Sequence, residues 1–305
     1  MKLATTTADF SRYFDSPEEC IKHVVDAGFR YLDMSFYGEA KKDSRFFDAD
    51  WRSYAKRLRE YAQGLGACFV QAHSPGGNPL AYGEQRQLLV DATIRSIEVC
   101  EILGIPNTVV HAGWRAGIGK EEYFQENLEF YRLLFPTMER CGVNVLIENS
   151  TRANMGENFY FFTGSDMREF LEYAGHERLG ACWDTGHANI EGAQYDEILA
   201  LGDCLKAVHI NDNRGEKDEH ILPFCGTVNM DEIMHALIDV GFQGSFTFEC
   251  DSTLRPYDYW LGNRRRFAGD KRLKNAPLDV MQKFEEALFL TGKYILSTYG
   301  CSDAE

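Results

Sequence analysis

The sequence predicts an α/β fold, a single (β/α)8 barrel that occupies residues 1–305 as one domain. Three observations predict it: strand-like and helix-like segments alternate along the whole chain, there are eight of each, and several strands end in a residue that can bind a metal. Such alternation favours parallel strands joined by right-handed helical crossovers. A count of eight favours a closed barrel over an open, doubly wound sheet.

The predicted strands are short apolar segments rich in β-branched and aromatic residues, which is typical of buried strands. Parallel strands of a barrel end at the same face, so the residues that follow them converge. The strands are expected at residues 2–7, 30–36, 68–73, 108–113, 144–149, 180–184, 205–211 and 245–250.

The predicted helices lie between these strands and carry ordinary start and stop signals. The first has Ser16 as its N-cap and Pro17 in the first helical position, and Gly28 stops it. The helices are expected at residues 16–27, 48–64, 83–103, 120–140, 165–174, 195–201, 229–240 and 277–296.

The composition argues against some locations and partners. The net charge is −15 at pH 7, which disfavours nucleic acid and anionic lipid as partners. The nine cysteines are scattered and contain no CxxC pair, which indicates reduced thiols in a cytoplasmic protein. The N-terminal segment lacks signal-peptide features, and no apolar run approaches the ~20 residues of a membrane span. The oligomeric state stays open, with a homo-oligomer as one alternative.

Three loops after strands are longer than the others, and long loops of this kind usually carry function. They cover residues 37–47, 150–164 and 252–276. The last contains a basic cluster at 264–274, which fits a phosphate-binding lid, an oligomer contact or an ordinary solvated surface.

Four residues at the ends of consecutive predicted strands have the chemistry of a metal site. Three carboxylates and one imidazole suit a divalent cation such as Mn²⁺, Mg²⁺ or Zn²⁺. Buried carboxylates at a barrel mouth are costly without a compensating charge. We call these residues the inner set: Glu148, Asp184, His209 and Glu249.

Five further residues of ligand type lie at or near the same strand ends. Five of the eight histidines fall in the two groups together, and such a concentration favours metal binding or catalysis. We call these residues the outer set: His73, His111, His187, Asp218 and His220.

The segments ENS, DTGH, HIND and FECD, with their spacing, resemble the xylose isomerase-like TIM barrel superfamily. That superfamily includes sugar phosphate isomerases and epimerases, ketose 3-epimerases and endonuclease IV of AP endonuclease family 2. The resemblance to the ketose epimerases implies one metal, bound in this chain by the inner set. It also implies that Glu148 and Glu249 act as acid and base. The resemblance to endonuclease IV implies a trinuclear zinc site, in which the residues of the outer set are additional ligands. The chain has all nine residues, so one to three divalent ions are expected: Mn²⁺ or Zn²⁺, with Mg²⁺ or Co²⁺ as alternatives.

The expected activity is a metal-dependent isomerase or epimerase of a sugar or sugar phosphate, in carbohydrate metabolism. It would transfer a proton next to a carbonyl through a metal-stabilised enediolate. Arg214, Trp114 and Trp183 are the candidate substrate-binding residues, and Phe36 and Tyr37 are further candidates for apolar walls. For each of these, core packing or a solvated surface is about as good an explanation.

Two alternatives remain. An endonuclease IV-like phosphodiesterase acting on abasic DNA would use all nine ligands, but the −15 net charge disfavours it. A non-catalytic barrel would have little use for so many ionisable residues.

Overall fold

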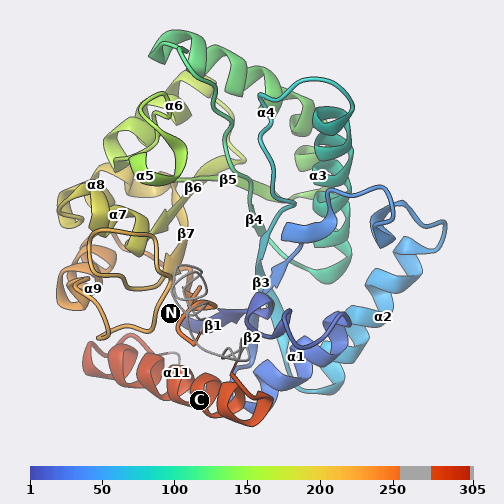
Figure 1. Ribbon diagram of the computed structural model, residues 1–305, viewed down its shortest axis with the longest axis vertical. Helices are drawn as coiled ribbons and strands as arrows, with labels where there is room; N and C mark the ends of the chain where they lie inside the picture. The colour runs from blue at the N-terminus through green and yellow to red at the C-terminus, as the bar shows by residue number, and fades with distance from the viewer. Residues whose placement is uncertain (255–275, 303–305) are drawn as a thin grey trace, which may run out of the picture.

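The computed structural model, which describes residues 1–254 and 276–302, is a closed barrel of eight parallel strands. Neighbours in the barrel are also neighbours in the chain, and β1 closes the barrel against β8. Helices surround the strands as an outer ring (Figure 1). The predicted fold class, a single (β/α)8 TIM barrel, is confirmed.

The strands are short, and most begin and end within two residues of their predicted bounds. The exception is β4, which ends four residues early; the Val110 N–H still bonds to the Leu146 carbonyl, whereas the Gly113 N–H bonds to the Asn127 side chain. The strands are β1 (Lys2–Thr6), β2 (Tyr31–Ser35), β3 (Cys68–His73), β4 (Asn107–Val109), β5 (Asn144–Glu148), β6 (Leu179–Asp184), β7 (Leu205–Ile210) and β8 (Ser245–Phe248).

All eight predicted helices are present and bury one face against the barrel. Ser16 precedes α1 and Pro17 begins it, as predicted. The helices are α1 (Pro17–Asp26), α2 (Trp51–Gly64), α3 (Glu84–Leu103), α4 (Lys120–Cys141), α6 (Gly164–Ala174), α8 (Tyr195–Leu201), α9 (Met230–Asp239) and α11 (Leu278–Thr298).

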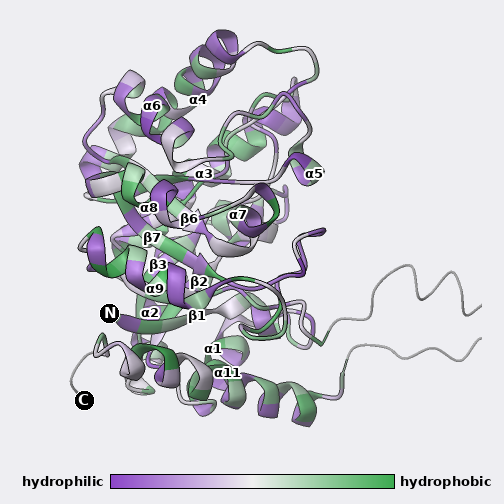
Figure 2. Cartoon of the chain, turned by 90° about the vertical axis from the view of Figure 1, so that its left-hand side faces the viewer, coloured by the Kyte–Doolittle hydropathy of each residue, from purple (hydrophilic) through white to green (hydrophobic). Residues whose placement is uncertain are grey.

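Several short helices were not predicted, and most of them follow a strand. The helices that follow a strand lie where the chain leaves the barrel. Figure 2 shows two of them, α5 and α7, toward the end opposite the N-terminus. The short helices are η1 (Thr7–Phe10), η2 (Tyr37–Glu39), η3 (Arg45–Phe47), α5 (Arg152–Met155), α7 (Thr185–Glu191) and, before β7, η4 (Gly202–Cys204).

The core has two parts. A large apolar cluster fills the space between strands and helices. A separate small cluster of Val109, Leu146, Cys182 and Ala207 comes from four consecutive strands. All nine cysteines lie in the described part of the chain and are free, as predicted.

No helix in the described ranges is both long and apolar enough to cross a membrane. The predicted basic cluster at 264–274 lies outside the described residues.

Candidate metal centre and substrate pocket

The alternation of side chains along the strands brings the inner set together. Glu148 lies two residues after Leu146, Asp184 two after Cys182 and His209 two after Ala207. Residues two apart point to the same face of a strand. Each ligand therefore shares a face with a member of the small cluster, and that cluster forms an apolar floor beneath the site.

The four side chains of the inner set converge. One ligand atom from each of Glu148, Asp184, His209 and Glu249 lies within 4.8 Å of all the others. His209 is central: its Nδ1 is 2.5 Å from Oε1 of Glu148 and 3.2 Å from Oε2 of Glu249. Asp184 and His209 are fully buried, which fixes their positions.

The charges of Glu148 and His209 depend on each other. Burial alone would raise the pKa of Glu148, but the His209 and His111 imidazoles hold that pKa well below its usual range. Burial likewise opposes the charged form of His209, but Cys182, Glu249 and Glu148 hold its pKa well above its usual range. A positive charge at this position is therefore strongly favoured, and a cation provides one.

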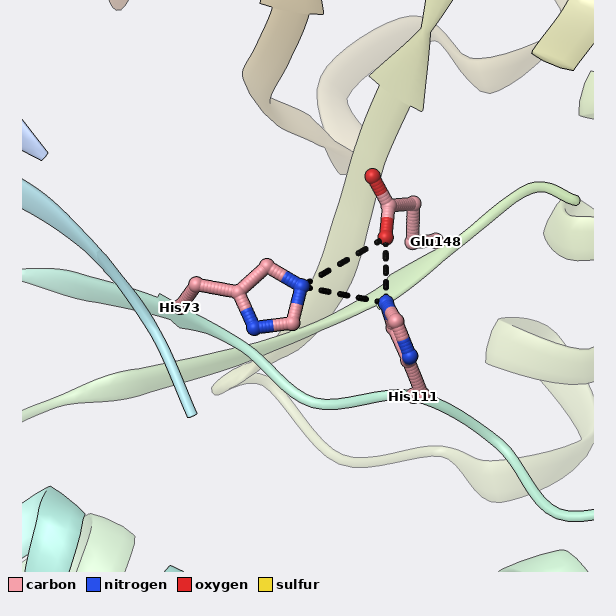
Figure 3. A group of neighbouring side chains, drawn as sticks. All are labelled: His73, His111 and Glu148. Atoms are coloured by element: carbon pink, nitrogen blue, oxygen red, sulfur yellow. Dashed lines mark hydrogen bonds and ion pairs between the residues drawn. The ribbon is translucent and has the colours of Figure 1, made fainter. Parts of the chain in front are cut away.

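The first part of the outer set adjoins Glu148 directly. Figure 3 shows His73 and His111 pointing toward its carboxylate. The His111 Nε2 is 2.7 Å from Oε2 of Glu148 and 3.1 Å from the His73 Nε2. These three residues form a second group with the spacing of metal ligands.

The other part of the outer set adjoins Asp184 and Glu249. The His187 Nε2 is 3.1 Å from Oδ2 of Asp218, and the His220 Nε2 is 2.9 Å from Oδ1 of the same residue. His187, His220 and Asp184 form a third ligand group. His220 has a φ of +46°, a left-handed conformation that non-glycine residues seldom adopt and that often marks a functional site.

The chemistry of these donors fits a divalent metal. The Nδ1 atoms of His73, His187 and His220 each lie within 3.1 Å of a backbone carbonyl, to which they donate. This contact places the Nδ1 proton, so Nε2, which faces Asp218 or His111 in the structure, is the atom that would bind a metal, the usual arrangement around metal-binding histidines. The inner set supplies three more carboxylate groups at the same place. The residues present therefore fit one metal in the inner set and have donors for more.

Two asparagines and a glycine hold the inner set, and the sequence did not reveal their role. Asn149 exchanges two hydrogen bonds with the Asp184 backbone, at 2.7 and 2.9 Å. The Asn211 amide donates to the Asp184 carboxylate at 2.7 Å. A Cβ on Gly186 would lie 1.8 Å from Oδ1 of Asn211, so only glycine fits there. The available signal was position, because each asparagine immediately follows a strand.

A cavity of about 830 Å³ opens at the candidate metal centre. Such volumes are typical of small-molecule sites. The residues lining it include Glu148 and Glu249 from the inner set and all five of the outer set. Tyr37 also lines it, whereas Phe36 is buried and packs against Phe46.

The structure places the three predicted substrate-binding residues in the core, against it or at the surface. Trp183 is 1% exposed, and its indole N–H donates to Gln194 in the core. Trp114 is half-buried and packs against the core. Arg214 forms an ion pair with Glu219 on the surface. None of the three is among the described residues that line the cavity.

The fold and site together define a (β/α)8 barrel with a candidate metal centre at the carboxyl ends of its strands, the face on which such barrels carry their active sites. Residues 21–267 match the model of the xylose isomerase-like TIM barrel family. The chain belongs to this family.

The curated relatives match only part of the chain. The uncharacterised protein y4fM of Sinorhizobium fredii is 33% identical over 172 residues, which cover 54% of this chain and 53% of that protein. A probable endonuclease 4 of Cenarchaeum symbiosum is 28% identical over 174 residues, 52% of this chain and 60% of that protein. The chain therefore spans little more than half the length of these relatives.

Solved structures match nearly the whole chain at low sequence identity. D-psicose 3-epimerase from Clostridium cellulolyticum H10, determined with D-tagatose, has a TM-score of 0.74 and 19% identity and covers 97% of this chain and 99% of its own. The IOLI protein with a bound zinc atom has a TM-score of 0.73 and 16% identity, covering 98% and 99%. At such identity, these matches establish the fold alone.

Proposed function

We propose that the protein is a metal-dependent isomerase or epimerase of a small sugar or sugar phosphate. One observation carries the proposal. Glu148 and Glu249 are the two inner-set residues that also line the cavity, whereas Asp184 and His209 are fully buried. Two carboxylates can therefore reach a substrate while the other two ligands support the centre from below.

The reaction needs a proton removed from a carbon beside a carbonyl and then returned. A divalent metal in the inner set supplies Lewis-acid polarisation of substrate oxygens. The His209 and His111 imidazoles keep Glu148 ionised, and as a carboxylate that lines the cavity it is placed to accept the proton. Glu249 contacts the same His209 Nδ1 atom as Glu148, and because it also lines the cavity it is placed to return a proton to the substrate. Leu146, two residues before Glu148, belongs to the apolar floor and packs beneath that group.

The proposal includes Mn²⁺ or Zn²⁺ as the metal, with Mg²⁺ or Co²⁺ as alternatives. D-psicose 3-epimerase and the zinc-containing IOLI protein, which share the fold, support a sugar substrate and a metal. The nine free cysteines support a reducing, cytoplasmic location.

The test is turnover of a panel that includes D-psicose, D-tagatose and D-fructose by metal-loaded protein, compared with Glu148→Gln and Glu249→Gln variants. Loss of a general acid or base typically lowers the rate by about 10²- to 10⁴-fold. Both variants should lose activity on this scale while circular dichroism stays unchanged. Glu60→Gln, on the exposed side of α2, is the matched control and should keep full activity. Full activity in either site variant would refute the acid–base assignment.

Phosphodiester hydrolysis is the second candidate, and the outer set favours it. Two further ligand groups flank the inner set, which is the arrangement that a cluster of metals on a phosphate requires. The probable endonuclease 4 relatives point the same way. Cleavage of an abasic-site duplex by the metal-loaded protein, together with no turnover of any sugar, would establish this alternative.

A further inference from the structure

The chain leaves β2 through two aromatic residues that have opposite environments. Phe36 is 3% exposed and packs edge-on against Phe46, with ring centroids 5.2 Å apart. Tyr37 begins η2 and is 57% exposed. The buried neighbour anchors the segment, and the second ring is left at the wall of the cavity.

The backbone and a glycine hold the Tyr37 ring in place. The Gly76 N–H donates to the Tyr37 carbonyl at 2.9 Å. A Cβ on Gly76 would lie 2.5 Å from Cζ of the Tyr37 ring and within 2.9 Å of both Cε atoms. The ring therefore lies against the bare Cα of Gly76, in a space that any other residue would fill.

The Tyr37 ring also contacts the histidines of the candidate metal centre. Its centroid is 5.4 Å from the His73 ring and 6.3 Å from the His111 ring, both in edge contacts. Tyr37, His73 and His111 line the same cavity, whereas Gly76 is not among its described lining residues. A change at Gly76 can therefore alter the cavity only by moving the ring.

We propose that Tyr37 is a substrate-binding platform that packs against the C–H-bearing face of a sugar, and that Gly76 is the residue that positions it. An aromatic ring that presents an apolar face and a polar hydroxyl at a wet site suits a ligand with both characters. A sugar beside Glu148 has such a face as well as hydroxyls. The inference rests on the proposed function, since it identifies a binding residue for the same site.

The test compares Tyr37→Ala, Tyr37→Phe, Gly76→Ala and the double variant Tyr37→Ala/Gly76→Ala. Gly76 does not have a positive φ, so alanine fits its backbone, and the three atoms nearest to the new Cβ all belong to the Tyr37 ring. Gly64→Ala is the matched control, because a Cβ there meets nothing within 4 Å. The readouts are KM and kcat for the sugar that the wild type converts best, and calorimetric binding of D-psicose, D-tagatose and D-fructose.

Aromatic packing contacts of this kind change affinity by roughly three- to tenfold. Tyr37→Ala and Gly76→Ala should each raise KM by that factor with a smaller change in kcat, and Tyr37→Phe should retain most of the affinity. Gly76→Ala should have no further effect in the Tyr37→Ala background, because there is no ring left to displace. Gly64→Ala should behave as wild type.

The outcomes separate this inference from the proposed function. Unchanged KM and affinity in Gly76→Ala, or additive losses in the double variant, would overturn the role of the Tyr37–Gly76 pair while leaving the isomerase proposal intact. Sugar binding that weakens as described, without turnover by the wild type, would support the platform and refute the isomerase. If the wild type binds none of the three sugars, both the platform inference and the isomerase proposal are overturned.

Discussion

Two buried pairs, Glu148 with His209 and Asp9 with Glu285, differ in the direction in which the pKa of their carboxyl groups is shifted. At the metal site, Glu148 is 3% exposed and lies beside the imidazoles of His209 and His111, which hold its pKa well below its usual range. Between η1 and α11, Asp9 and Glu285 are 3% and 0% exposed. Burial raises the pKa of both, and nearby carboxylates raise it further: Asp251 acts on Asp9, and Asp9 acts on Glu285.

The difference lies in the partners. Thr5 donates to Oδ2 of Asp9 at 2.9 Å, but neither Asp9 nor Glu285 forms an ion pair within the described residues. Burial without a cation favours the neutral acid, whereas burial beside imidazoles favours the anion. Glu148 thus has the positive neighbours that Asp9 and Glu285 lack, and positive charge beside a buried carboxylate is the condition a metal site requires.

The largest expected effect comes from removing the positive partner at the site. In metal-free protein, His209→Gln leaves Glu148 buried without its closest imidazole, so the free energy of unfolding should fall by about 3–5 kcal/mol. Urea denaturation in the presence of a chelator measures this change. His235→Gln, on the exposed side of α9, is the matched control and should change stability by less than about 0.5 kcal/mol. Equal stability of the two variants would contradict the dependence of Glu148 on His209.

The second effect is stabilisation by metal. An ion that binds only the folded protein adds about 2.7 kcal/mol when its concentration is 100 times Kd. Zn²⁺ or Mn²⁺ should therefore raise the Tm of wild type, and a chelator should reverse the rise. Asp184→Asn should lose most of this response, and mass spectrometry should find less bound metal. A full Tm response in Asp184→Asn would place the ion outside the inner set.

Much of the fold followed from the sequence because it depends on local patterns. Apolar segments such as 144–148 alternate with helices that have clear caps, and this pattern predicted the barrel. The convergence of Glu148 and Asp184 followed from the topology, since parallel strands end at one face. The same reasoning excludes Trp183 from the site: it immediately precedes Asp184 and so points to the other face of β6.

Other features depend on contacts between residues far apart in the chain, which local patterns do not reveal. The Asn211 amide meets Asp184, 27 positions earlier, and Gly76 meets Tyr37 across a loop. Arg214 forms an ion pair with Glu219 at the surface, which its position in the sequence does not reveal. The start of α7 is a local feature by contrast: the His187 N–H, in its first turn, bonds to the side chain of Asp184, which is both N-cap and candidate ligand.

The smallest expected effect concerns Asp9 and Glu285. Substitution there should stabilise the protein, whereas His209→Gln should destabilise it. A carboxyl whose pKa is higher in the folded than in the unfolded state takes up a proton on folding, so stability falls as pH rises above the unfolded pKa of about 4. Glu285→Gln removes that group, and Gln cannot ionise. The variant should match wild type near pH 4 and become more stable than wild type as pH rises toward 8, by a margin on the order of 1 kcal/mol.

Urea denaturation of both proteins across this pH range measures the difference. Glu286→Gln, one position along α11 and paired with Lys283 at the surface, is the control and should show no such divergence, because exposed ion pairs contribute little. If Glu285→Gln were instead less stable than wild type at pH 8, Glu285 would have to be ionised and paired in the folded protein. The contrast between the two buried pairs would then fail, because each would owe its charge to a partner.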